Sequence, residues 1–161
     1  MKKGVLLFCF DTPDFQYHKI LERCVALVKK NLKLEITVVT NFDTYKNLKP
    51  LGFVNYKFIE PELGNMKNGL EWRNVDRHMA YELSPYDTTL VMDIDYFPFT
   101  DNLKKFLDAK YDFLISKNAY DLTNRNSFDT RKYSMIDMVW ATVFVFKKSN
   151  KAKRIFDMVK Y

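Results

Sequence analysis

Two aspartates separated by one residue are the side chains of this sequence best suited to chemistry. Asp93 and Asp95 follow the apolar run TTLVM, which is typical of a buried strand. Because side chains alternate along an extended chain, the two carboxylates should point to the same side. Carboxylates that converge repel each other unless a cation lies between them. The pattern therefore predicts a site for Mn²⁺ or Mg²⁺, hard cations that prefer oxygen ligands and would neutralise a diphosphate.

A second group of charged residues precedes this strand. A helix is expected over residues 70–83, and it would place Arg73 and Arg77 four residues apart with Asp76 on the same side. The forked donors of arginine match phosphate or carboxylate oxygens. A surface ion-pair cluster of the same three residues is the alternative interpretation, and the spacing alone favours neither.

The elements that must position these residues alternate between strands and helices. Apolar or β-branched runs indicate strands over residues 4–10, 34–40, 54–59, 88–93, 111–116 and 142–147. Helical spacing or capping residues indicate helices that begin near Tyr17, Leu70, Thr100 and Ser149. This order predicts an α/β fold: a single Rossmann-like α/β/α sandwich with a mainly parallel sheet, spanning residues 1–161.

Ligands of open α/β sheets bind beyond the carboxyl ends of the strands. Besides the Asp93 strand, two predicted strands end in residues that could contact a ligand. Phe10, Asp11 and Thr12 close the first strand, and Asn41 follows the second. These residues should therefore gather at the edge of the sheet where Asp93 lies.

Residues 117–139 do not fit the regular pattern, since they are mostly polar and show no clear periodicity. A stretch of this length in a small domain indicates a lid or binding loop, or else a helix that the pattern conceals. The stretch offers Asp121, Asp129 and Asp137 as general bases for an acceptor hydroxyl. Asp137 lies nearest the last strand and is the preferred candidate, with a solvated loop position as the alternative for each.

Composition excludes several other classes of protein. The hydrophobic fraction of 47% and charged fraction of 29% are those of a globular domain, which argues against disorder. The net charge is +6, but the last fifteen residues carry six basic side chains against Asp157, so the remainder sums to only +1. A basic terminal helix without a nucleic-acid-binding motif favours a solvated face, and no nucleic-acid partner is expected.

Localisation and redox state follow from the same inspection. No apolar run approaches the roughly 20 residues of a membrane span, and the first residues lack a signal-peptide pattern, so a cytoplasmic protein is expected. Cys9 and Cys24 fall among apolar residues and should be buried thiols rather than a disulfide. His18 and His78 show no zinc-binding spacing.

The arrangement of strand, D-I-D, apolar residues and short capped helix resembles the donor site of GT-A fold nucleotide-sugar glycosyltransferases. The likeness extends to GVLLFCFDT at the start, to the arginine-bearing segment before D-I-D, and to WATVFVFKKSNKAKRIF near the end. It implies a metal-dependent transferase that moves a sugar, UDP-linked in our expectation, to an acceptor that the sequence does not identify. Residues 117–139 would then form the acceptor-side loop.

The resemblance also implies roles for individual residues. Asp93 would contact the ribose or the metal, and Asp95 would coordinate the metal bound to the diphosphate. Near the base the matching positions are Phe10, Asp11, Thr12 and Asn41, and near the ribose and phosphates they are Arg73, Asp76 and Arg77. Retaining members often carry a Gly or Asn-x-Gly segment where this chain has Trp140-Ala141-Thr142, so the resemblance does not define the contact with the donor sugar.

Three alternatives remain beside this interpretation. A degenerate domain of the same fold would bind a nucleotide or a partner without turnover. A haloacid-dehalogenase-type phosphatase also uses D-x-D, but Cys9 replaces its nucleophile near the start and Phe97 departs from its pattern after D-I-D. A nucleotidyltransferase generally needs a glycine-rich phosphate loop, and FDTPDF contains no glycine.

Overall fold

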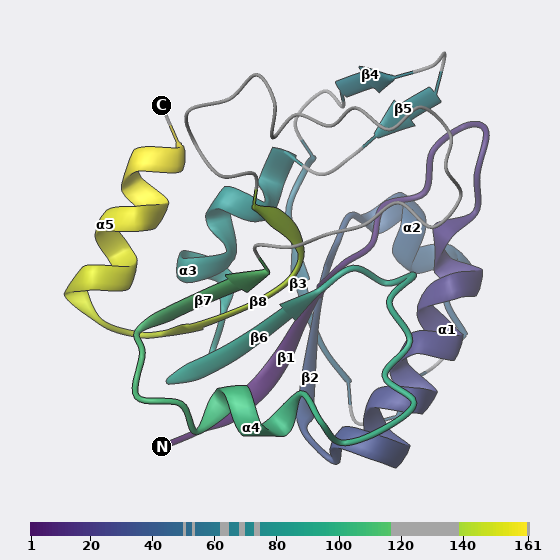
Figure 1. The fold of residues 1–161 in the computed structure, drawn as a ribbon. Coiled ribbons are helices and arrows are strands. Elements are labelled where there is room, and N and C mark those ends of the chain that lie inside the picture. Colours follow the sequence, from purple (N-terminus) through teal and green to yellow (C-terminus); the bar gives the residue numbers. More distant parts are fainter. Residues whose placement is uncertain are drawn as a thin grey trace, which may run out of the picture.

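A six-stranded mixed sheet organises the chain, and its central strands are parallel (Figure 1). The computed structural model describes residues 1–49, 51–52, 54–61, 65–67, 70–72, 75–116 and 139–160. In sequence order the strands of this sheet are β1 (Lys3–Phe8), β2 (Glu35–Thr40), β3 (Val54–Phe58), β6 (Thr88–Met92), β7 (Phe113–Ser116) and β8 (Trp140–Lys147). Their spatial order is β3-β2-β1-β6-β8-β7, with β8 antiparallel to both of its neighbours. The predicted α/β sandwich with a mainly parallel sheet is confirmed.

Helices cover both faces of the sheet (Figure 1). Helix α1 (Tyr17–Leu27), which continues into the π-helical turn η1 (Val28–Leu32), packs on one face, together with α4 (Lys104–Leu107). Helices α3 (Ala80–Leu83) and α5 (Asn150–Val159) pack on the other, with the 3₁₀ helix η2 (Val75–Met79) leading into α3. The short α2 (Phe42–Asn47) directly follows β2. This layering makes the protein a three-layer sandwich.

The alternation of β1 side chains divides the core into two halves. Val5 and Leu7, and Cys9 directly after the strand, belong to the cluster under α1 and α4. Leu6 and Phe8 belong to the cluster under α3 and α5. All five are at most 9% exposed, so β1 is buried on both faces, as the continuous apolar run predicts.

One predicted helix is confirmed only in part. Residues Leu70–Trp72 form β5, which pairs antiparallel with β4 (Asn65–Lys67) in a separate two-stranded sheet, rather than the first turn of a helix. Among the described residues of the predicted range, Val75–Met79 form a 3₁₀ helix and Ala80–Leu83 form α3. The helical spacing of a few apolar residues is a weak indication, because a segment as short as Leu70–Trp72 does not form a stable helix on its own. Pairing with the neighbouring strand β4 therefore determines its structure.

Other sequence predictions have mixed outcomes. Cys9 and Cys24 are buried free thiols, as expected. Helix α5 begins where predicted, with the Ser149 hydroxyl accepting a hydrogen bond from the Ala152 N–H at 3.2 Å. The expected loop over residues 117–139 falls outside the described residues, apart from the exposed Val139. Among the helices that the structure describes, none is both long and apolar enough to cross a membrane.

Candidate functional site at the carboxyl edge of the sheet

The carboxyl ends of β2, β1 and β6 lie at one edge of the sheet, because these three neighbouring strands run parallel. Asn41, Asp11 and Asp93 stand just beyond these ends. Phe10 lies beside them but is only 4% exposed and packs into the core under α3 and α5. The structure therefore brings together the strand-end residues that the sequence predicts, with Phe10 as a wall rather than a polar contact.

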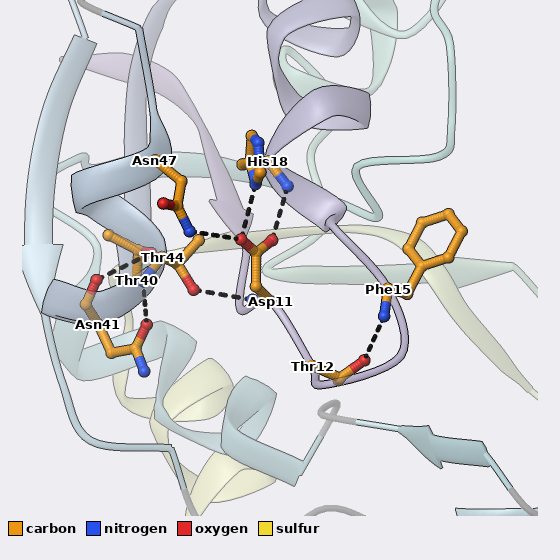
Figure 2. Close-up of polar contacts among 8 residues, drawn as sticks. All are labelled: Asp11, Thr12, Phe15, His18, Thr40, Asn41, Thr44 and Asn47. Atoms are coloured by element: carbon orange, nitrogen blue, oxygen red, sulfur yellow. Dashed lines mark hydrogen bonds and ion pairs between the residues drawn. The ribbon is translucent and has the colours of Figure 1, made fainter.

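Asp11 joins three elements through its carboxylate (Figure 2). Its Oδ1 accepts the backbone N–H of His18 at 2.9 Å, and its Oδ2 lies 2.6 Å from His18 Nδ1. The same Oδ2 accepts a bond from Asn47 Nδ2 at 3.3 Å, and the Asp11 N–H donates to Thr44 Oγ1 at 2.8 Å. Asp11 thus ties the end of β1 to both α1 and α2. Its carboxylate is committed to the protein rather than presented to a ligand.

Asn41 begins α2 as its N-cap residue. Its Oδ1 accepts the Thr44 N–H at 3.0 Å, and its backbone carbonyl accepts the Tyr45 N–H at 3.0 Å. The side chain is nearly buried, at 8% exposure. Its Nδ2 makes no hydrogen bond to a described residue, and Figure 2 shows this nitrogen pointing away from α2. Asn41 can therefore offer an amide donor to a ligand while its oxygen holds the helix.

Thr12 forms a tight turn with Phe15. Each backbone N–H of the pair bonds the other's carbonyl, at 3.0 and 3.2 Å, and the Thr12 hydroxyl also accepts the Phe15 N–H at 3.1 Å. The turn leaves the Phe15 ring 48% exposed beside Tyr17, with 4.7 Å between the ring centroids. Thr12 thus shapes the segment between β1 and α1.

Asp93 and Asp95 lie on a turn rather than on an extended strand. Strand β6 ends at Met92, and the Tyr96 N–H donates to the Asp93 carbonyl at 3.0 Å. The Asp93 N–H donates to the Thr142 carbonyl at 2.8 Å, which fixes the turn against β8. Strand alternation therefore does not govern the two side chains: the Asp93 side chain is 20% exposed, whereas Asp95 is an exposed residue.

Arg77 meets Asp93 across the site. Its Nη2 forms an ion pair with Asp93 Oδ1, and its Nη1 donates to the Ala141 carbonyl at 3.4 Å. Asp76, the preceding residue of η2, is 2% exposed and belongs to the interior rather than to a surface cluster. Arg73 and Asp137, like the alternatives Asp121 and Asp129, lie outside the described residues.

The charge state of Asp93 reflects these surroundings. Burial raises the pKa of its carboxyl from 3.8 to about 6. The Arg77 guanidinium opposes this shift, while the Asp95 carboxylate adds to it. Asp95 also contributes, after burial, to raising the pKa of the Cys24 thiol to about 12. The two carboxylates are therefore close enough for the charge of Asp95 to affect the pKa of Asp93. The sequence predicts this proximity, although the two residues lie on a turn and not on a strand.

Three contacts of the site are absent from the sequence-based prediction. His18, Thr44 and Asn47 hold Asp11 from two helices, at separations of 7, 33 and 36 residues. Of these three residues, only His18 could have been singled out from the sequence, because it is a polar residue on the otherwise apolar face of α1. Among the described residues, no group of three or more His, Cys, Asp or Glu side chains could hold a metal ion.

Comparison with solved structures shows the class of fold. The galactosyltransferase LgtC, solved with donor and acceptor sugar analogs, aligns with a TM-score of 0.69 and 17% identity. The glycosyltransferase GlyE of Streptococcus pneumoniae TIGR4 aligns with a TM-score of 0.56 and 12% identity. A 4-diphosphocytidyl-2C-methyl-D-erythritol synthase from Anaerococcus prevotii DSM 20548 aligns with a TM-score of 0.51 and 15% identity.

These alignments cover 96%, 98% and 98% of this chain, respectively. The chain itself spans 62% of LgtC, 37% of GlyE and 74% of the synthase. No family model matches the sequence, and neither does any curated protein. The fold is that of GT-A-like nucleotide-diphospho-sugar transferases, and at these identities the comparison establishes the fold alone.

The Asp11 contacts generate a prediction about stability. Asp11→Ala should lower the free energy of unfolding by about 2–3 kcal/mol, because it removes an ionised acceptor from three donors. Asp14→Ala is the matched control: Asp14 is exposed in the same segment, and its replacement should change the value by less than about 0.5 kcal/mol. Urea unfolding of the three proteins measures both effects. Equal stability of the two variants would show that Asp11 does not join the helices.

The Asp93 environment generates a prediction about pH. A raised carboxyl pKa means that the folded state holds its proton more tightly than the unfolded state between about pH 3.8 and pH 6. The stability that the protonated Asp93 carboxyl contributes is fully present below about pH 3.8. It is lost as the pH rises through about 6. Relative to Asp93→Asn, the wild type should therefore lose on the order of 2–3 kcal/mol between pH 4 and pH 7.5. Urea unfolding in EDTA measures the difference, and parallel pH profiles would contradict it.

Proposed function

We propose that this chain is the donor-binding part of a metal-dependent glycosyltransferase, which moves a sugar from a nucleoside diphosphate, UDP in our hypothesis, to an acceptor. The observation that carries the proposal is the Arg77–Asp93 pair, with Asp95 exposed beside it, beyond the end of β6. A cation-binding carboxylate pair and an arginine at one sheet edge suit a diphosphate leaving group.

Asp93 and Asp95 are the residues that would hold Mn²⁺ or Mg²⁺. The fit rests on the chemistry of the donor set: Asp93 offers a carboxylate oxygen, Oδ1, which is paired here with the Arg77 guanidinium. Asp95 contributes an exposed carboxylate on the same turn. Two carboxylates form a partial ligand set, which suits a cation that also binds water and donor phosphates. When bound, the metal would supply Lewis-acid neutralisation of the charge that develops on the leaving diphosphate.

Arg77 would work with these carboxylates. Its guanidinium is already oriented by Asp93 and by the Ala141 carbonyl, so little freedom is lost when a phosphate binds. Donors fixed in advance stabilise developing negative charge without reorganisation, an effect worth several kcal/mol in comparable sites. Arg77 is therefore assigned to the diphosphate, and Arg73 and Asp76 remain predictions for the ribose side.

The nucleobase of the donor would lie near the ends of β1 and β2. Asn41 offers its Nδ2 amide to an acceptor atom of the ligand, while Phe10 provides an apolar wall. Asp11 and Thr12 act indirectly in this proposal, since their polar groups hold the loop between β1 and α1. Asp137 remains the predicted general base, which would deprotonate the acceptor hydroxyl in an inverting reaction.

The first test of this function is metal-dependent nucleotide binding. Calorimetric titration of UDP, GDP, CDP and ADP should show tight binding of one nucleotide with Mn²⁺ and at least tenfold weaker binding without it. Asp95→Asn should abolish the effect of metal and leave the unfolding midpoint unchanged, because the side chain is exposed. Asp101→Asn, an exposed aspartate shortly after the turn, is the matched control and should bind like the wild type.

Two outcomes would contradict the proposal. Unchanged affinity of Asp95→Asn in the presence of metal would remove Asp95 from the site. Absence of binding by all four nucleotides would favour the degenerate, non-catalytic domain. A nucleotidyltransferase shares the fold, as the Anaerococcus synthase shows, but FDTPDF supplies no glycine-rich loop for a triphosphate.

The Arg77–Asp93 pair yields a separate prediction. Without nucleotide, the guanidinium competes with a divalent cation for the same carboxylate. Arg77→Gln should therefore bind Mn²⁺ roughly tenfold more tightly, which corresponds to about 1.4 kcal/mol. The same variant should bind the nucleotide–Mn²⁺ complex more weakly, because a phosphate donor is lost. Arg154→Gln, at an exposed position of α5, controls for the change in net charge.

Electron paramagnetic resonance of Mn²⁺ measures the first effect, and calorimetry the second. Opposite signs of the two changes are expected only if Arg77 faces both the carboxylate and the phosphates. Weaker binding of Mn²⁺ alone by Arg77→Gln would show that the arginine supports the cation site rather than competing for it.

A further inference from the structure

Strand β3 forms one edge of the main sheet and has a free side. Among the strands that the structure describes, β3 pairs only with β2, in parallel. Just after β3, the Ile59 N–H donates to the Thr40 carbonyl of β2 at 3.0 Å. Because backbone groups alternate in direction along a strand, the N–H and C=O groups of Val54, Tyr56 and Phe58 point away from β2. No described residue bonds these groups, so β3 can accept a further strand.

Two aromatic rings are exposed at the carboxyl end of this edge. Phe42 of α2 and Phe58 of β3 stack face to face, with 4.5 Å between their centroids and 3° between their planes. Phe42 is 57% exposed and Phe58 42%. The Tyr45 ring meets Phe58 edge-on, with 5.2 Å between the centroids. This aromatic pair, Phe42 and Phe58, is thus held in a fixed orientation, and exposed apolar surface of this kind commonly marks an interface.

An apolar cavity of about 440 Å³ lies at the other end of β3. Its lining includes Leu48, Leu51 and Gly52 of the connection between α2 and β3, together with Tyr56. The Tyr56 side chain packs on the face of the sheet under α1. Phe58 follows two residues later and shares this face. The cavity and the aromatic pair therefore stand on one face of the edge, at opposite ends of β3.

The two ends of the strand also differ in charge. Asp43 follows Phe42, and its side chain is 87% exposed in a pair with Lys46 at 3.0 Å. A pair this exposed contributes little and leaves Asp43 available to another cation. Lys49 lines the cavity, and no described residue forms an ion pair with it. A negative side chain beside the aromatic pair and a positive one beside the cavity make this edge complementary to a copy of itself.

We propose that two copies of this chain associate through their β3 strands, which pair antiparallel about a two-fold axis at Tyr56. In this register Tyr56 lies opposite Tyr56 of the second copy, and Phe58 lies opposite Val54. All three residues have free backbone groups on this side, so each opposed pair exchanges two N–H···O bonds. The main sheet then continues without interruption from one copy into the other.

The two-fold rotation also exchanges the ends of the strand. The aromatic pair of each copy meets the cavity of the other, and Asp43 of each copy meets Lys49 of the other. An isologous contact forms every interaction twice, so one complementary set of residues is sufficient. The Phe58 ring leaves water for a surface that contains Leu48 and Leu51, and this burial of apolar area drives the association.

Lys57 does not prevent this pairing, although lysine on an edge strand commonly blocks association. Its side chain alternates with that of Tyr56 and so points to the opposite face of the sheet. In the proposed register Lys57 lies opposite Asn55 of the second copy, so the two lysines are not directly opposed.

This inference is independent of the proposed function. Strands β2 and β1 lie between β3 and β6, so the contact is roughly 14 Å from the strand that ends before Asp93. Antiparallel pairing of the two β3 strands directs the carboxyl edges of the two sheets in opposite directions. Both candidate donor sites therefore remain open in the dimer.

Sedimentation velocity between 2 and 500 µM, without nucleotide or divalent cation, tests the association. At the highest concentration the chain should sediment with twice its mass of 19.2 kDa, and it should dissociate on dilution. Phe58→Ala should raise the dissociation constant at least tenfold, because it removes the ring that meets the cavity. Phe99→Ala, at a position that is 72% exposed elsewhere, is the matched control and should associate like the wild type.

Charge exchange tests the two-fold arrangement. Asp43→Lys and Lys49→Asp should each raise the dissociation constant at least threefold, because each places like charges together. The variant that carries both changes should return to within twofold of the wild type, since the pair is reversed but retained. Lys151→Asp, at an exposed position of α5, controls for net charge and should have no effect. All these positions are exposed, so the fold should persist.

Hydrogen exchange measured by nuclear magnetic resonance locates the contact. The Tyr56 and Phe58 amides should exchange at least tenfold more slowly in the wild type than in Phe58→Ala at the same high concentration. The Asn55 and Lys57 amides should change less, because they already face β2. Protection of alternate residues is expected when a strand is added to the free side of β3.

Several results would overturn the inference. A dimer that Phe58→Ala leaves unchanged, or one without protection of the Tyr56 amide, would exclude β3 as the interface. Failure of the double charge variant to regain affinity would exclude the two-fold register. A chain that stays monomeric at every concentration, with a freely exchanging Tyr56 amide, would overturn the inference in favour of an extended strand from another protein. None of these results depends on nucleotide binding, so the donor site stands or falls separately.

Discussion

A single strand that is buried on both faces sets the geometry of the molecule. Every side chain of β1 from Val5 to Phe8 is apolar and buried, and both backbone edges of the strand are paired in parallel. Register therefore cannot slip by one residue without exchanging the two halves of the core. In the observed register, Leu7 lies opposite both Val38 and Met92. The three carboxyl ends are consequently fixed side by side, and polar residues placed just beyond them must meet.

The fold follows from the sequence wherever burial produces a pattern. The strands around Leu6, Val38 and Val91 are continuous apolar or β-branched runs, and no other element accommodates them as well. Helix α2 was not predicted because it has only six residues, of which Thr44 alone is buried, so no helical periodicity of apolar residues marks it. Strand β5 falls within the predicted helix 70–83, although Asn68-Gly69, the pair most typical of a two-residue hairpin turn, directly precedes it in the sequence.

The candidate site is predictable in position but not in its contacts. Strand ends locate Asp11, Asn41 and Asp93, because topology alone brings them to one edge. Their partners come from elements whose packing no local pattern encodes: Asp11 meets Asn47 across 36 residues, and the Asp93 N–H reaches Thr142. Alternation fails for Asp95 because the chain turns at Asp93. The spacing of Asp93 and Asp95 thus predicts that the two carboxylates lie close together. How far each is exposed to solvent depends on the turn.

The pairing of β7 with β8 has a consequence for how this domain can diversify. Ser116 lies opposite Trp140, so the two described residues that flank the segment 117–139 are neighbours in the sheet. Closing a connection between fixed neighbouring ends becomes less favourable only with the logarithm of its length, by about 0.6 kcal/mol for each doubling. Insertions, deletions or wholesale replacement there would leave the hydrogen bond between Thr142 and Asp93 in place. Evolution, or a protein engineer, can therefore vary the connection between β7 and β8 almost independently of the sheet that holds the carboxylates.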